Sequence, residues 1–75
     1  MSFEEFQNHL SEIVDQPAAE LPRNAKLENL EGWNSMAMVS FIAFADEYME
    51  KTLSPRTIGP CETVAELARV AGVDA

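Results

Sequence analysis

The segment from Ser35 to Glu50 restricts the possible folds most, because it contains neither glycine nor proline and is mostly apolar. It is rich in alanine and methionine, which favour helix. We therefore predict a helix that begins near Ser35 and ends at about Met49 or Glu50. Only Ser40 interrupts the apolar residues before Asp46. The helix is thus either buried on more than one side or exposes apolar surface.

An amphipathic helix is predicted for residues 3 to 15. Ser2 followed by Glu5 forms the pattern of a capping box at its start. Apolar residues then recur at spacings of three and four, which places them on one helical face. These residues are Phe3, Phe6, Leu10, Ile13 and Val14.

The stretch from Gln16 to Asn34 is predicted to be a long ordered loop. Pro17 and Pro22 interrupt any helical periodicity, and the intervals between its leucines fit no sustained helix or strand. We expect these leucines to pack across the helices. They are Leu21, Leu27 and Leu30.

Two further helices are predicted in the last third of the chain. Ser54 is expected to cap a single turn that starts at Pro55 and stops before Gly59. Thr63 and Glu66 form a second capping-box pattern, which opens the last helix. The apolar stripe of that helix ends at a glycine. The stripe consists of Val64, Leu67, Ala68 and Ala71, and Gly72 follows it.

No segment alternates with a period of two for long enough to be a strand, so the fold class is expected to be all-α, a small four-helix bundle. It has three main helices, one short third helix and a long first connection. Seventy-five residues make one domain at most, spanning 1–75. Met1 and the cap at Ser2 suggest a complete, discrete chain, which we expect to be monomeric.

Charge and composition exclude several classes of partner. Thirteen acidic residues against five basic ones give a net charge of −8, which repels nucleic acid and anionic lipid and favours basic protein surfaces. One cysteine and one histidine provide no internal disulfide and no zinc spacing. The acidic start is unlike a secretory signal, and the longest apolar run is too short to span a bilayer. We expect a cytoplasmic protein without membrane insertion.

Ser35 is the candidate functional residue. A serine directly before an apolar helical run is, by itself, most often only an N-cap. Asn34 caps a helix equally well, however, and if Asn34 is the cap, the Ser35 hydroxyl lies in the first turn and can point outward. A phosphate attached there would lie at the positive end of the helix dipole. The position therefore suits a phosphodiester.

The chain resembles the acyl carrier proteins over its whole length. Leu27, Leu30, Gly32 and Trp33 fall where many carriers have the pattern L..L.GW, and Asn34-Ser35-Met36 falls on their Asp-Ser-Leu motif. Thr63-Val64 falls on the start of their last helix without a gap. Each motif is short, and the combined spacing carries the resemblance.

The resemblance implies a bundle of the acyl-carrier type and a covalent cofactor. Ser35 would receive 4′-phosphopantetheine from coenzyme A and hold an acyl or aminoacyl group as a thioester. The protein would be a carrier and not an enzyme. Its partners would be a phosphopantetheinyl transferase, a loading ligase, and downstream synthase or transferase enzymes of fatty-acid, polyketide, nonribosomal-peptide or surface-glycan pathways.

Two departures from the family pattern concern these partners. Asn34 replaces the usual Asp, so one negative charge available for recognition by a transferase is absent. The first turns of the second helix carry apolar residues where many relatives carry acids; here the acids come later, at Asp46, Glu47 and Glu50. We therefore consider a docking surface made of Met36, Ala37 and Met38. The alternative is that these residues line the core or an acyl-sheltering pocket.

That pocket, if present, is expected among residues of the last three helices and their neighbours: Val39, Ile42, Ala43, Ile58 and Val64.

Other candidate residues have ordinary structural interpretations. His9 is expected on the polar side of the first helix, in contact with solvent, and Cys61 is expected to be a buried, inert thiol. Trp33 is expected to pack the end of the loop against the helices. Clustered acids such as Glu4-Glu5 and Asp46-Glu47 are expected to be solvated helix faces.

A different class of function stays open. An acidic all-helical interaction module could mask a basic partner surface without any prosthetic group, and it would not need the Ser35 hydroxyl. An enzyme is the third possibility, but the chain offers no catalytic dyad, metal spacing or glycine-rich phosphate loop.

Overall fold

The computed structural model describes residues 1–73, and this part of the chain is all-α. It has four α-helices, and the first connection contains two 3₁₀ turns, Ala18–Glu20 and Leu27–Asn29. The helices are α1 (Phe3–Val14), α2 (Ser35–Met49), α3 (Pro55–Ile58) and α4 (Val64–Val70). Within residues 1–73 there is no strand, only one isolated antiparallel bridge between Lys26 and Thr63. The predicted fold class is confirmed at this level.

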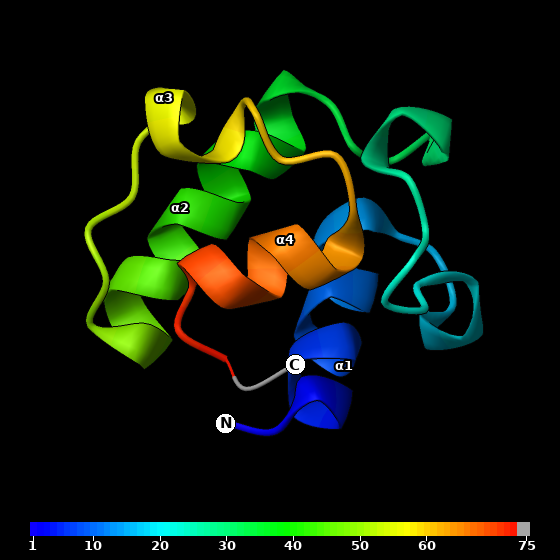
Figure 1. The fold of residues 1–75 in the computed structure, drawn as a ribbon, viewed down its shortest axis with the longest axis horizontal. Coiled ribbons are helices and arrows are strands. Elements are labelled where there is room, and N and C mark those ends of the chain that lie inside the picture. Colours follow the sequence, from blue (N-terminus) through cyan, green and yellow to red (C-terminus); the bar gives the residue numbers. More distant parts are fainter. Residues whose placement is uncertain (74–75) are drawn as a thin grey trace.

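The helices are arranged around a shared apolar interior (Figure 1). The long α2 runs along one side, α4 crosses the middle of the view, and the short α3 lies beside the beginning of α2. The connection from α1 to α2 occupies the side away from α3. The loop that leads into α2 thus lies at the edge of the bundle, where its residues can reach solvent.

Helix α1 has the predicted cap. The Glu5 N–H donates to Ser2 Oγ at 3.1 Å, and the Ser2 N–H donates to Glu5 Oε1 at 3.2 Å. Both halves of the capping box are therefore present. The helix ends at Val14, because Asp15 adopts a left-handed conformation with φ 56°. Phe3, Phe6, Leu10 and Val14 are buried, while Ile13 is only partly buried.

The long connection is ordered by its leucines and by backbone hydrogen bonds. All three leucines, Leu21, Leu27 and Leu30, are buried, as predicted. The Leu27 N–H donates to the Glu62 carbonyl at 2.9 Å, and the Val64 N–H donates to the Ala25 carbonyl at 3.0 Å. These bonds join the loop to the start of α4. The connection is therefore part of the folded framework and not a flexible link.

The core under α2 is aromatic. Phe6 of α1 meets Phe41 of α2 edge-on, with ring centroids 5.9 Å apart, and Phe44 packs beside both. Phe41 is fully buried and Ala45 is fully buried one turn later. This face fixes the rotation of α2 and so decides which of its residues face outward.

The caps of the last two helices differ in part from the sequence prediction. Ser54 precedes α3 as expected, but its Oγ lies 3.2 Å from Thr57 Oγ1 and makes no capping bond to the backbone. Thr63 Oγ1 accepts from the Glu66 N–H at 3.2 Å, as predicted. The Glu66 carboxylate, however, accepts from the Glu62 N–H at 2.7 Å, one residue earlier than in a capping box.

Candidate functional site

Ser35 is the first residue of α2, and Asn34 is its cap. The Asn34 side chain accepts from the Ala37 N–H at 2.9 Å, and the Asn34 backbone is extended, with φ −139° and ψ −174°. Ser35 is exposed, and its hydroxyl has no hydrogen-bond partner within residues 1–73. The prediction for these two residues is therefore confirmed, because the Asn34 amide caps the helix and the Ser35 hydroxyl faces solvent.

The electrostatic environment at Ser35 favours an anion. The Met38 N–H donates to the Asn34 carbonyl at 2.9 Å and the Ala37 N–H is bound by the cap, whereas the N–H groups of Ser35 and Met36 have no partner in the described chain. These unpaired groups carry the positive end of the helix dipole. A phosphate on the Ser35 hydroxyl would lie beside them.

The turn before Ser35 is held in place by a close backbone approach. Gly32 lies against the end of α1 so closely that a Cβ built on it would be 1.8 Å from the Val14 carbonyl oxygen. The Gly32 N–H donates to Gln16 Oε1 at 3.2 Å, and the Trp33 N–H donates to the Leu30 carbonyl at 3.1 Å. Only glycine fits this position. The turn that leads to Ser35 is thus held against the end of α1.

The apolar residues at the start of α2 divide between surface and core. Met36 is 80% exposed and Val39 is 66% exposed. Ala37 is only 4% exposed, and Met38 is half-buried against the core. Of the three residues considered for docking, only Met36 is at the surface, and Val39 joins it. Exposure therefore agrees with the core alternative for Ala37 and, in part, for Met38, and it leaves Met36 available for docking.

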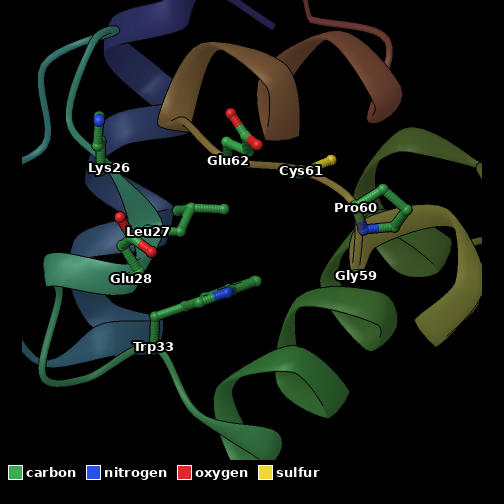
Figure 2. A pocket seen from close by; sticks show the side chains of 8 residues that line it. All are labelled: Lys26, Leu27, Glu28, Trp33, Gly59, Pro60, Cys61 and Glu62. Carbon is green, nitrogen blue, oxygen red and sulfur yellow. The ribbon is translucent and has the colours of Figure 1, made fainter.

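A hollow of about 560 Å³ lies between the loop before α2 and the segment that joins α3 to α4. Figure 2 shows the Trp33 ring on one side of it, with Pro60 and Cys61 on the other and the chain running from Trp33 into α2. Leu27 adds apolar lining. Charged side chains also line the hollow: Lys26, Glu28 and Glu62.

This hollow is not the one that the sequence suggested. Of the five residues expected to form an acyl-sheltering pocket, none lines the hollow beside Trp33. Val39 and Ala43 are exposed, while Ile58 and Val64 are buried in the core. Ile42 is partly buried against the core. The expected pocket is therefore divided between solvent-exposed and core positions. No sequence signal pointed to the lining, since it depends on the contact between residues 26–28 and 60–62.

His9 was expected to be merely solvated, and this prediction was wrong. It is half-buried, and its ring packs 4.9 Å from Phe44 and 5.1 Å from Tyr48, measured between ring centroids. The spacing of Phe44 and Tyr48, four residues apart on α2, was the available signal that one ring could cover both. His9 contacts these rings and not Ser35.

Trp33 and Cys61 occupy positions close to those predicted. The Trp33 ring meets Phe41 edge-on at 6.0 Å between centroids, so it packs the end of the loop against α2. Cys61 is half-buried, less than expected. Desolvation, with a smaller contribution from the Glu66 charge, raises the pKa of its thiol. A raised pKa leaves little thiolate, which agrees with an unreactive cysteine.

The acidic residues are solvated. Glu4 and Glu5 on α1 and Asp46 and Glu47 on α2 are all exposed, as expected. Glu50, which follows α2, is exposed too and adopts φ 54°. Within residues 1–73, no group of three or more His, Cys, Asp or Glu side chains is arranged to hold a metal ion. No helix in this part of the chain combines the length and hydropathy needed to cross a bilayer.

Comparison of the chain with protein-family models, with curated proteins and with solved structures gives no match.

Proposed function

We propose that this chain is a carrier protein of the acyl-carrier type, with Ser35 as the attachment residue for 4′-phosphopantetheine. The observation that carries the proposal is the arrangement at the start of α2: Asn34 caps the helix, and the Ser35 hydroxyl is left exposed beside unpaired N–H groups. The order of elements supports it further. A long ordered loop precedes α2, and a single-turn α3 precedes α4, as in that family.

The residues present fit the proposed group chemically. Ser35 Oγ would form the new ester bond to phosphorus while the pyrophosphate bond of coenzyme A breaks, releasing adenosine 3′,5′-bisphosphate. Within residues 1–73 no side chain is hydrogen-bonded to the Ser35 hydroxyl, and His9 packs against Phe44 and Tyr48. We therefore assign acceptance of the hydroxyl proton to the transferase. The exposed N–H groups of Ser35 and Met36 stabilise the resulting phosphodiester anion. The arm supplies a terminal thiol that holds acyl groups as thioesters.

The exposed side chains of Met36 and Val39 support a partner contact next to Ser35. A loading enzyme or a transferase must approach the Ser35 hydroxyl closely, and these two side chains lie within the first turns of the same helix. Methionine adapts its shape to different partners. We assign this apolar pair to docking, and the acids at Asp46 and Glu47 to the outer part of the contact, where they attract basic surfaces.

Intact mass measurement tests the proposal directly. The protein is incubated with coenzyme A and a broad-specificity phosphopantetheinyl transferase, with Ser35→Ala alongside. A gain of one phosphopantetheine on the parent and none on the variant is expected. If neither gains mass, Asn34→Asp restores the charge found in the family. If Asn34→Asp is also unmodified, the result counts against a carrier function.

The second candidate is an acidic module that masks a basic protein surface. The observation that favours it is the exposure of the acids on α1 and α2, together with a net charge of −8. Such a module would retain its function in Ser35→Ala, whereas a carrier would lose it completely. The two candidates are therefore separated by the same variant.

A further inference from the structure

Gln16 follows the end of α1, and its side chain binds the loop that leads into α2. The Gly32 N–H donates to Gln16 Oε1 at 3.2 Å, across sixteen residues of sequence. Within residues 1–73, the other hydrogen bonds of residues 31–34 stay inside the loop or go to α2 itself. The bond from Gly32 to Gln16 therefore ties the turn before Ser35 to the end of α1.

The Gln16 side chain has a defined orientation. Its Nε2 donates to Glu20 Oε1 at 3.0 Å, while its Oε1 accepts from Gly32. A flipped amide would place donor against donor and acceptor against acceptor. The Gln16 backbone is fixed too, because its N–H donates to the Ser11 carbonyl at 3.1 Å and its carbonyl accepts from Ser11 Oγ. Gln16 is thus an oriented acceptor for the turn.

The contact lies beside the first turn of α2. Gln16, Gly32, Asn34 and Met36 all line one hollow of about 460 Å³. The close packing of Gly32 against α1 fixes how near the turn lies, and the hydrogen bond fixes the direction of the Gly32 N–H. Because a peptide unit is planar, this direction sets the rotation of the whole unit before Gly32 and so the course of the chain into Asn34. The cap on the Ala37 N–H depends on that course.

We propose that Gln16 is a positioning residue for the modification of Ser35. This inference rests on the proposed function, since it concerns the same hydroxyl. Gln16 acts through Gly32 and Asn34, and without its acceptor the turn samples other arrangements, so that fewer molecules present Ser35 on a capped helix. A transferase that requires the capped arrangement then binds the carrier with an apparent affinity reduced by that fraction. The KM for the carrier rises, and kcat does not change.

The first test is the kinetics of phosphopantetheine transfer, with the carrier as the varied substrate. Gln16→Leu removes the acceptor at a similar side-chain size, and KM should rise by about two- to tenfold, which corresponds to the loss of one hydrogen bond. Gln7→Leu is the matched control. Gln7 Nε2 donates to the Leu21 carbonyl at 2.8 Å, so it also joins α1 to the long connection, but near the beginning of that connection. Its KM should equal the parent's. No rise in Gln16→Leu, or an equal rise in Gln7→Leu, would overturn the proposal.

Exchanging two side chains tests the hydrogen bond itself. Gln16→Glu keeps an acceptor for Gly32 but places a second carboxylate next to Glu20, so KM should rise. Adding Glu20→Gln supplies a donor opposite the new carboxylate and leaves the net charge as in the parent. The double variant should therefore have the parent's KM. A double variant with the KM of Gln16→Leu would show that this hydrogen bond does not position Ser35.

Amide hydrogen exchange, followed by NMR, is a readout that does not need modification. The Ala37 N–H is bound by Asn34 and not by Gln16, so its exchange rate reports on the cap. Exchange at Ala37 should be faster in Gln16→Leu, by a factor similar to the rise in KM, and unchanged in Gln7→Leu. Far-UV circular dichroism verifies that each variant is folded.

The exchange measurement also separates failure of this inference from failure of the proposed function. If the parent and Asn34→Asp are both unmodified by the transferase, the proposed function fails, and faster exchange at Ala37 in Gln16→Leu would still show that Gln16 positions the turn. If the parent is modified and neither KM nor the exchange at Ala37 changes in Gln16→Leu, the inference fails and the proposed function stands.

Discussion

Replacing Asn34 and Ser35 by alanine, one at a time, tests which of the two residues caps α2. In Asn34→Ala the bond to the Ala37 N–H, 2.9 Å long, is lost. Loss of an N-cap costs about 0.5–2 kcal/mol. Ala37 is only 4% exposed, so water reaches the freed N–H poorly, and we expect about 1.5 kcal/mol, in the upper part of that range.

That loss is large for a chain of this size. At about 0.05–0.15 kcal/mol per residue, 75 residues have a total stability of about 4–11 kcal/mol. A change of 1 kcal/mol shifts the Tm of such a domain by about 4–8 °C, so Asn34→Ala should melt about 6–12 °C below the parent. Ser35→Ala removes an exposed hydroxyl without a partner and should shift the Tm by less than about 4 °C.

The assay combines thermal unfolding, followed by far-UV circular dichroism, with the mass measurement of phosphopantetheine transfer. Asn34→Ala should lose stability while retaining the modifiable hydroxyl, and Ser35→Ala should do the reverse. Asn34→Asp is the conservative control and should keep both properties, since aspartate caps as well as asparagine. A Tm for Ser35→Ala as low as that of Asn34→Ala would mean that Ser35 is the cap, and the reasoning would be refuted.

Three other predictions concern separate parts of the chain. Gly32→Ala forces a Cβ to within 1.8 Å of the Val14 carbonyl oxygen, so the loop must move away from α1. We expect the free energy of unfolding, measured in urea, to fall by about 3 kcal/mol. A free energy of unfolding equal to the parent's would contradict the close approach. Hydrogen bonds from the Ser2 backbone and side chain lower the pKa of Glu5 below its ordinary value of 4.5. The resulting stabilisation is present above pH 4.5 and disappears as the pH falls through the lowered pKa. The Tm difference between the parent and Glu5→Gln should therefore shrink on acidification. A Tm difference that does not change with pH would exclude the Glu5 carboxylate as the source of the stabilisation. Met36→Glu should leave the Tm within about 4 °C of the parent because Met36 is 80% exposed, yet should slow loading by a partner enzyme; unchanged loading would remove Met36 from the docking surface.

The helices, and the caps of α1 and α2, could be predicted because the signals are local. The capping box of Ser2 and Glu5, the cap at Asn34 and the spaced leucines of the loop each depend on residues a few positions apart or on burial alone. The exposed position of Ser35 followed from the assignment of its neighbour as the cap. These parts of the candidate site were therefore accessible from the sequence.

The parts that could not be predicted depend on contacts between distant segments. The hollow beside Trp33 exists because the backbone at Leu27 bonds to Glu62, thirty-five residues later. The packing of the His9 ring against Phe44 and Tyr48 depends on how α1 and α2 lie against each other. The exposure of individual residues on α2 depends on its rotation, and the nearly continuous apolar run of that helix does not encode a rotation.

Trp33 is the only tryptophan of the chain, and its place next to Phe41 and on the wall of the hollow has a practical consequence. Indole emission responds to the polarity of its surroundings, so this ring is an intrinsic fluorophore two residues from the proposed attachment point. A molecule that entered the hollow would displace water from the ring and alter the emission. Where the attached arm or its cargo enters the hollow, loading can be followed in real time on the unlabelled protein, with Ser35→Ala as the reference spectrum.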